Sequence, residues 1–167
     1  YGSLDSWIKY NRHPLSEKFL LVIGAGNIGF RVSEKMKFFM QIITFDILNN
    51  DYEELEDMIK KADCVSLHIP NNDENFSFID SEKLSWMKKD AILINTSRGA
   101  LVNEEALYNE LNKKRLYSAF DVFWKEPYEG KLKEFYPDRF FMTPHIASTS
   151  TGFLDGCQKD LIKFIKE

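Results

Sequence analysis

The sequence contains little cysteine, no long apolar run and no excess of positive charge. Its two cysteines are Cys64 and Cys157, and neither their number nor their spacing fits a disulfide framework or a zinc site. We therefore expect free thiols and no bound metal. No apolar run approaches the roughly 18 residues that a membrane-spanning helix requires. The net charge of −4 gives no electrostatic support for binding to a nucleic acid.

The first residues also lack the features of a secretion signal. A signal peptide has a basic segment followed by an apolar core, and residues 1–5 show neither. We therefore expect a cytoplasmic protein that does not associate with a membrane. Residues 1–14 are expected to form an N-terminal helix or linker that ends at Pro14. Residues 15–167 are expected to form one domain, which is long enough to bury a substantial core.

A glycine-rich turn between a predicted strand and a predicted helix is the most informative feature that is present. The apolar residues 20–23 are typical of a buried strand, and Gly24, Gly26 and Gly29 follow with the spacing G-x-G-x-x-G. Apolar residues then recur at helical spacing over residues 28–39. Gly24 would allow a tight turn, Gly26 would let the backbone approach a pyrophosphate, and Gly29 would let the helix pack closely on the strand.

An acidic residue, Asp46, ends the next predicted strand, residues 41–46, about 20 positions after the glycines. A carboxylate at this place can accept hydrogen bonds from the hydroxyl groups of an adenosine ribose. It would also repel a 2′-phosphate, and no arginine follows it, since the next residues are Ile47, Leu48 and Asn49. The sequence therefore predicts a dinucleotide site that takes NAD in preference to NADP.

Short apolar strands alternate with helical patterns along the chain. Further strands are predicted at 64–68, 91–95, 116–121 and 140–142, with helices near 27–39, 52–60, 81–88 and 103–114 and a last helix near Ser148 or Thr149. The predicted capping residues are Asp80 or Ser81 for the helix near 81–88 and Asn103 for the helix that follows. Nearly continuous apolar strands joined by helices indicate a parallel sheet that is covered on both faces. The predicted fold is therefore α/β, a doubly wound parallel sheet of the Rossmann type, in which ligands bind past the carboxyl ends of the strands.

Four reactive side chains follow three of these strands. Arg98 follows the fourth strand, Asp121 ends the fifth with Glu126 shortly after it, and His145 follows the sixth. An arginine binds a carboxylate through two parallel hydrogen bonds, a histidine carries a proton near neutral pH, and a carboxylate beside the histidine orients it. Each residue alone would also suit a surface or structural role. Gathered at one sheet edge, they are the groups needed to reduce a 2-keto acid.

Four ordered motifs resemble those of the D-isomer-specific 2-hydroxyacid dehydrogenase family. They are the glycine turn with Asp46, Asn-Thr-Ser-Arg-Gly at 95–99, Asp-Val-Phe-Trp-Lys-Glu-Pro at 121–127, and Thr-Pro-His-Ile-Ala at 143–147. The resemblance covers residues 15–155. It implies that Arg98 binds the substrate carboxylate, that His145 is the acid–base residue and that Glu126 is its partner. It also implies that the cofactor is contacted by Asp121, at the nicotinamide carboxamide, and by Asn27, Ile28, Ile69, Pro70, Asn75, Thr96 and Ser97.

The resemblance also implies that a part of the enzyme is absent from this sequence. Members of this family close a second, substrate-binding domain over the cofactor, and no segment here corresponds to that domain. We expect the NAD-binding domain of an oxidoreductase that interconverts a D-2-hydroxy acid and its 2-keto acid, with little activity alone. Relatives in the family dimerise through this domain, so we expect a homodimer, with Trp7 and Ile8 as candidate interface residues. The alternative is an NAD-responsive binding or regulatory module without turnover.

Overall fold

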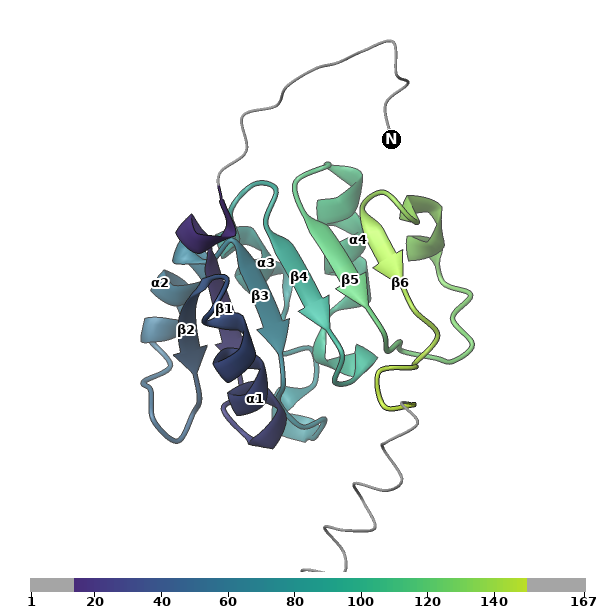
Figure 1. Ribbon diagram of the computed structural model, residues 1–167. Helices are drawn as coiled ribbons and strands as arrows, with labels where there is room; N and C mark the ends of the chain where they lie inside the picture. The colour runs from purple at the N-terminus through teal and green to yellow at the C-terminus, as the bar shows by residue number, and fades with distance from the viewer. Residues whose placement is uncertain (1–13, 150–167) are drawn as a thin grey trace, which may run out of the picture.

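The structure, a computed structural model, describes residues 14–149, and these residues contain a six-stranded parallel sheet (Figure 1). The strands are β1 (Phe19–Ile23), β2 (Gln41–Phe45), β3 (Cys64–Leu67), β4 (Ile92–Asn95), β5 (Tyr117–Phe120) and β6 (Phe140–Met142). The helices are α1 (Asn27–Met36), α2 (Glu54–Lys61), α3 (Ser81–Trp86) and α4 (Glu104–Asn112), with short 3₁₀ turns at Leu15–Glu17, Asp73–Asn75, Gly99–Leu101 and Lys131–Phe135. The predicted alternation of strands and helices is confirmed.

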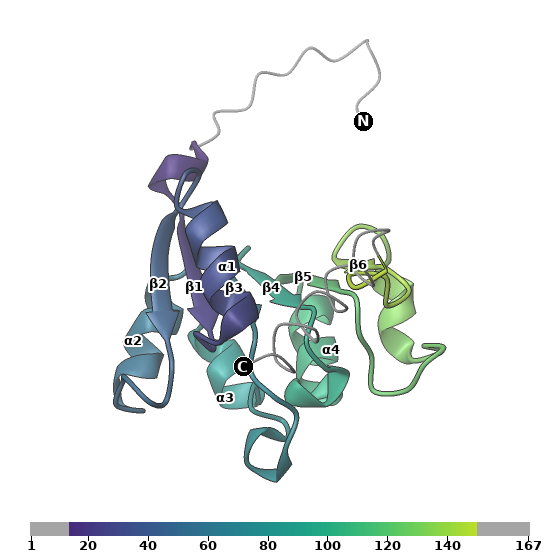
Figure 2. The same cartoon turned by 60° about the horizontal axis from the view of Figure 1, so that its bottom comes forward.

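The order of the strands creates a crevice at one edge of the sheet. The order is β2-β1-β3-β4-β5-β6, and every neighbouring pair is parallel. The direction in which successive strands are added reverses between β1 and β3, so the connections after these two strands leave on opposite faces. Ligands of such sheets bind at this reversal, past the carboxyl ends of the strands. Figure 2 turns this edge towards the viewer.

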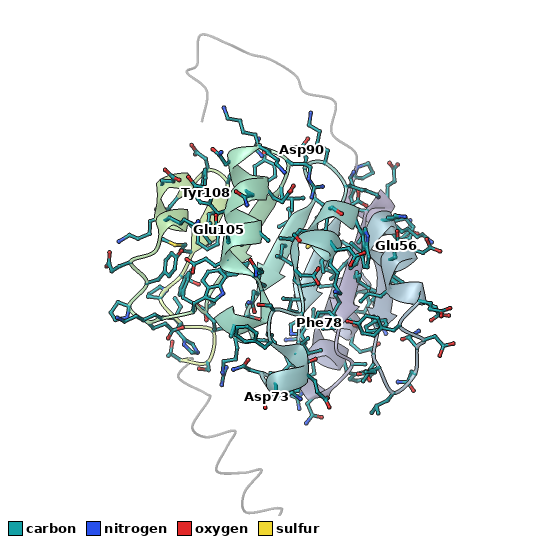
Figure 3. The ribbon with its side chains drawn as sticks, turned by 180° about the vertical axis from the view of Figure 1, so that it is seen from behind. Glu56, Asp73, Phe78, Asp90, Glu105 and Tyr108 are labelled. Carbon is teal, nitrogen blue, oxygen red and sulfur yellow. The ribbon has the colours of Figure 1, made fainter. Side chains whose placement is uncertain are left out.

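The helices are divided between the two faces, which makes the sheet doubly wound as predicted. Helix α1 lies on one face over β1 and β2, whereas α2, α3 and α4 cover the other face (Figures 1 to 3). Side chains alternate along β1 accordingly. Leu21 and Ile23 belong to the large core under α2, α3 and α4, and Leu20 and Val22 belong to a small core under α1.

Within residues 14–149, helix α1 covers its face of the sheet over β1 and β2 only. On the α1 face, no helix of residues 14–149 lies over β4, β5 and β6 (Figure 1). Ile92 on β4 is 40% exposed and Phe141 on β6 is 51% exposed as a result. The expectation that both faces are covered is therefore confirmed over β1 and β2. The last predicted helix lies outside the described residues, so over β4, β5 and β6 the expectation for this face stays a prediction.

Helix starts follow the predicted capping residues. The side chain of Asn103 accepts a hydrogen bond from the N–H of Ala106 at 2.9 Å and begins α4 as predicted. Asp80 begins α3 in the same way by accepting from the N–H of Lys83 at 2.9 Å, which decides between the two candidates Asp80 and Ser81.

Helix ends were predicted less well. The first helix was expected to extend to residue 39, but α1 ends at Met36. Phe38 and Phe39 continue as turns and are largely exposed, so no core contact supports another helical turn before the chain enters β2. Ala147 and Ser148 form a turn, and the helix predicted to begin near Ser148 or Thr149 would lie in the residues that follow, outside the described range. Three further residues with a prediction also lie outside the described range: Trp7, Ile8 and Cys157. In residues 14–149 no helix is long and apolar enough to cross a membrane.

Candidate functional site

The glycine turn after β1 has the geometry that its sequence predicts. Gly24 has a φ of 98°, a left-handed conformation that disfavours other residues, and its N–H donates to the carbonyl of Phe45 at 2.8 Å. A Cβ on Gly24 would lie 2.6 Å from the carbonyl oxygen of His68, and a Cβ on Gly29 would lie 1.9 Å from the carbonyl oxygen of Gly24. Gly24 and Gly29 are therefore required by the close approach of β1, β3 and α1.

Gly26 differs from the other two glycines because it faces open space. No heavy atom lies within 4 Å of the position that a Cβ on Gly26 would occupy. Gly26 is the N-cap residue of α1, and Asn27 and Ile28 form the first turn, in which no acidic side chain occurs. The first N–H groups of a helix have no partner within the helix and carry a partial positive charge. The turn therefore offers an anion a free approach to the start of α1.

Asp46 closes the glycine turn from the end of β2. Its carboxylate accepts hydrogen bonds from the N–H of Ala25 at 2.7 Å and from the N–H of Leu48 at 3.0 Å. A carboxylate has about four acceptor sites, so both oxygens of Asp46 can still accept from a ligand hydroxyl. The position of Asp46 beside the glycine turn is as predicted, and its hydrogen bond to Ala25 is a structural role that the sequence did not reveal.

A cleft of about 410 Å³ lies beside the turn, between β2 and β3. It is lined by six of the predicted cofactor residues, Gly24, Gly26, Asp46, Ile69, Pro70 and Asn75. The side-chain amide of Asn75 donates to the carbonyl of Pro70 at 3.0 Å and so holds the segment after β3 in a compact loop. Tyr52, His68 and Phe78 also line the cleft, although the sequence did not single them out as cofactor residues.

The loop after β4 carries Thr96, Ser97 and Arg98. The side-chain amide of Asn95 donates to the carbonyl of Arg98 at 2.8 Å, and the hydroxyl of Ser97 donates to the carbonyl of Leu67 on β3 at 2.8 Å. These two bonds fix the path of the loop. Thr96 and Arg98 are exposed, and the Arg98 guanidinium donates to the carbonyl of Ser97 at 2.6 Å. The arginine is thus accessible to a ligand on a loop that its neighbours hold in place.

His145 and Glu126 form a pair, as predicted. His145 Nδ1 lies 2.8 Å from Glu126 Oε2, and the other oxygen of Glu126 accepts from the N–H of Phe123 at 3.0 Å. The hydrogen bond from His145, followed by the one from Phe123, holds the pKa of Glu126 below its ordinary value. An ionised carboxylate only accepts hydrogen bonds, so Nδ1 carries a proton and Nε2 remains available to a substrate. His145 also has a φ of 54°, a strained conformation typical of functional sites.

Asp121 anchors the turn that carries His145. Its buried carboxylate accepts hydrogen bonds from the hydroxyl of Thr143, from the N–H of Ile146 at 2.9 Å and from the N–H of Ala147 at 2.8 Å. Burial alone would raise the pKa of Asp121, but these hydrogen bonds outweigh it and hold the pKa below its ordinary value. The sequence predicted a cofactor contact for Asp121 and did not reveal this anchoring role.

The predicted reactive residues thus follow the carboxyl ends of neighbouring strands. Arg98 follows β4, Asp121 and Glu126 follow β5, and His145 follows β6, and these strands are adjacent and parallel. The glycine turn opens at the same edge of the sheet, after β1. A guanidinium that can bind a carboxylate, an imidazole that can transfer a proton and a turn that fits a dinucleotide phosphate therefore share one edge. The open space at Gly26 and the acid-free start of α1 fit a dinucleotide.

Four side chains that hold this site in place were not predicted to be functional. Asn95 binds the loop of Arg98, and Thr143 binds the carboxylate of Asp121. Both residues occur in the motifs quoted above, and this was the one sequence signal that could have identified them as functional. Trp124 and Tyr128 bind residues on the segment after Arg98, and Trp124 also occurs in a quoted motif, the one at 121–127. Their aromatic character alone does not distinguish them from core residues.

Comparisons with known proteins agree with this geometry. A sequence model of the D-isomer specific 2-hydroxyacid dehydrogenase, NAD binding domain, matches residues 4–147. The chain is 36% identical over 162 residues to a glyoxylate reductase from Pyrococcus horikoshii, and this match covers 88% of this chain and 48% of that protein. It is 34% identical over 157 residues to a hydroxypyruvate reductase from Thermotoga maritima, which covers 85% of this chain and 51% of that protein.

A solved structure is similar over nearly the whole chain. A D-lactate dehydrogenase from Aquifex aeolicus, in complex with NAD and lactic acid, superposes with a TM-score of 0.80 at 28% identity and covers 98% of this chain and 56% of that one. The chain therefore spans about half the length of the relatives it matches. Fold, glycine turn and sequence agree, and the chain belongs to the D-isomer specific 2-hydroxyacid dehydrogenase family, of which it is an NAD-binding domain.

Proposed function

We propose that this chain is the cofactor half of an enzyme that interconverts a D-2-hydroxy acid and its 2-keto acid by hydride transfer with NAD. The observation that carries the proposal is the pair of His145 and Glu126, joined at 2.8 Å, at the same sheet edge as Arg98 and the glycine turn. A module that only bound NAD would not need a histidine held by a carboxylate in a strained conformation at this edge.

In the reductive direction, Arg98 binds the carboxylate of the keto acid through two parallel hydrogen bonds. His145 donates a proton from Nε2 to the carbonyl oxygen, and Glu126 stabilises the protonated imidazole through Nδ1. NADH, when bound, would supply the hydride for the carbonyl carbon. In the oxidative direction, His145 accepts the hydroxyl proton at the same atom. Asp121 fixes the turn of His145 by accepting three hydrogen bonds from it. Asp121 is also our candidate for the residue that binds the carboxamide of the nicotinamide.

The remaining predicted residues would hold the cofactor along the sheet edge. The N–H groups at Asn27 and Ile28 would meet the pyrophosphate, and Asp46 would accept from the adenosine ribose. Ile69, Pro70 and Asn75 would flank the adenosine, since they line the cleft beside Asp46. Thr96 and Ser97 would lie near the nicotinamide.

The substrate class that we propose is a small 2-keto acid. The glyoxylate and hydroxypyruvate reductases among the relatives make glyoxylate and hydroxypyruvate the first compounds to test. The alternative is an NAD-responsive binding module without turnover, and the assay below distinguishes it from an enzyme. We also propose the domain boundary at residue 15, a homodimer and a cytoplasmic location. The free thiol of buried Cys64 is compatible with a cytoplasmic location, and a sedimentation run that found only monomers would reject the dimer.

The function is tested by the replacement His145→Ala. In the protein as it is encoded in full, oxidation of NADH is followed with glyoxylate and with hydroxypyruvate. The replacement should lower turnover by a factor on the order of 100 or more, because a positioned acid–base group contributes that much, while the affinity for NADH is retained. Turnover close to that of the unchanged protein would remove His145 from the mechanism. NADH binding with no turnover on any keto acid would favour the binding module.

A further inference from the structure

We propose that Trp124 and Tyr128 are positioning residues that clamp the loop of Glu126 to the segment that follows Arg98. We call residues 123–128 the glutamate loop and residues 98–104 the arginine segment. The clamp would keep the pair of Glu126 and His145 at a fixed place relative to the guanidinium of Arg98. This inference rests on the proposed function, because it names residues that support the same reaction.

The two segments touch through their backbones at Gly99. Gly99 is buried, and a Cβ at this residue would lie 2.1 Å from the carbonyl carbon of Phe123 and 2.4 Å from the nitrogen of Trp124. Any side chain larger than hydrogen would therefore push the glutamate loop away from the arginine segment. The residue directly after Arg98 thus sets the distance of closest approach between the two segments.

Trp124 makes the first side-chain contact of the clamp. Its indole N–H donates to the carbonyl of Val102 at 2.7 Å, and its ring packs on Phe120 of β5 with the ring centres 5.8 Å apart. Val102 is fully buried, so its carbonyl belongs to a part of the arginine segment that the core holds in place. The indole therefore connects the glutamate loop to a rigid point.

Tyr128 makes the second contact at the other end of the glutamate loop. Its hydroxyl donates to the carboxylate of Glu104 at 2.6 Å and accepts from the N–H of Leu132 at 3.2 Å. Glu104 is the first residue of α4, which the cap at Asn103 fixes. The ring of Tyr128 stacks on Phe123, with centres 4.9 Å apart and planes at 21°.

Phe123 is the junction through which the clamp acts on the acid–base pair. It lies against Gly99, its ring stacks on Tyr128, and its N–H donates to Glu126 at 3.0 Å. Lys125, Glu126 and Pro127 are exposed, so no burial holds this tip of the loop in place. A shift of Phe123 would move Glu126 and lengthen its hydrogen bond to His145.

The test compares conservative replacements within the clamp against a matched control. Tyr128→Phe keeps the aromatic ring and removes only the hydroxyl, so the ring and the stacked Phe123 are no longer tied to Glu104. Glu104→Gln keeps an acceptor without the charge. Trp124→Phe removes the indole donor. The control is Tyr108→Phe on α4. Tyr108 also contacts a carboxylate, that of Glu134, but it lies away from the carboxyl ends of the strands, where the candidate site is (Figure 3).

The first measurement is the pKa of the Glu126 carboxyl group, followed by carbon-13 NMR in this chain, which needs no activity. Tyr128→Phe and Trp124→Phe should each raise this pKa towards its ordinary value, because the donor at Phe123 is displaced. Tyr108→Phe should leave it unchanged. Adding Glu104→Gln to Tyr128→Phe should have no further effect, since the hydroxyl that Glu104 accepts from is already gone. If Tyr128→Phe does not fold, Glu104→Gln gives the same test with a smaller change.

The second measurement is turnover in the protein as it is encoded in full. Tyr128→Phe should lower kcat on the keto acid by roughly 10-fold, as expected for a small misplacement of a reacting group, with an unchanged KM for NADH. A Glu126 pKa equal to that of the unchanged protein in both Tyr128→Phe and Trp124→Phe would overturn the clamp. A raised pKa in a protein without turnover would support the clamp and reject the proposed function, so the two failures can be told apart.

Discussion

Gly26 and Gly29 should respond in opposite ways to the same added methyl group. We predict that Gly26→Ala weakens dinucleotide binding and leaves the fold unchanged. Gly26 has φ −63° and ψ −172°, which alanine adopts without strain, and its Cβ would meet no atom within 4 Å. Alanine restricts the unfolded chain, which stabilises by about 0.4–1 kcal/mol, and caps a helix less well than glycine, which costs roughly as much. The net change in unfolding free energy should stay within about 0.5 kcal/mol.

Gly29→Ala is the matched comparison. A Cβ on Gly29 would lie 1.9 Å from the carbonyl oxygen of Gly24, so α1 must move by about 1 Å to relieve the contact. Overpacking of this kind costs about 1–3 kcal/mol, and the better helix propensity of alanine returns about 1 kcal/mol. Because the contact is with fixed backbone, we take the upper end of that cost and expect Gly29→Ala to destabilise the domain by about 2 kcal/mol.

Urea unfolding and a fluorescence titration with NADH separate the two effects. Gly26→Ala should unfold like the unchanged chain and bind NADH at least about 10-fold more weakly, because its methyl group would occupy the space that we assign to the pyrophosphate. Gly29→Ala should unfold at a lower urea concentration. Unchanged NADH affinity in Gly26→Ala would refute the assignment of the turn as the phosphate site, whatever its stability.

Two further predictions concern carboxylates that bind the backbone. Asp46→Ala removes the acceptor for the N–H of Ala25, so NADH should bind more weakly. It also removes the charge that repels a 2′-phosphate, so the ratio of the affinities for NADH and NADPH should become smaller. Titration with both cofactors checks this, and an unchanged ratio of affinities would contradict it. For Asp121 the folded pKa lies below its ordinary value of about 3.9, so its ionised form stabilises the fold above that pH, and this contribution is lost as the pH falls through the lowered pKa. Asp121→Asn should therefore flatten the loss of stability between about pH 5 and pH 2 in urea unfolding, and parallel profiles would contradict this.

The fold class was predictable because the two secondary structures have different periods. The run of apolar residues in β1 and the helical spacing that follows in α1 identified a strand, a turn and a helix without any long-range information. The cap of α4 was predictable because Asn103 acts on an N–H only three residues away. The end of α1 was not predictable, since it depends on how little of Phe38 and Phe39 the rest of the chain covers.

The sequence predicted the reactive residues of the candidate site and the pair of His145 and Glu126, and it did not predict the hydrogen bonds that hold Asp46 and Asp121. Parallel strands bring their carboxyl ends to one edge, so Arg98, Glu126 and His145 could be placed together from their positions after strands. Ala25, which donates to Asp46, and the three donors to Asp121 lie 21 to 26 residues away from these carboxylates along the chain. Such bonds depend on the register of whole strands and on where each loop turns, which local patterns do not encode.

The amino-acid sequence by itself determined the alternation of strands and helices, the glycine turn with its acidic partner and the set of groups that could carry hydride chemistry. The strands, the helices and the glycine turn arise from neighbours within one or two turns of chain, where residue type and spacing decide the outcome. Asp46 and the reactive groups are far apart along the chain, and their positions after predicted strands placed them at one edge. Only the tertiary structure decided that Gly26 faces open space, that Asp121 holds the turn of His145 and that Trp124 and Tyr128 join two loops. These contacts exist because distant segments pack at van der Waals distance, and packing is a property of the assembled chain.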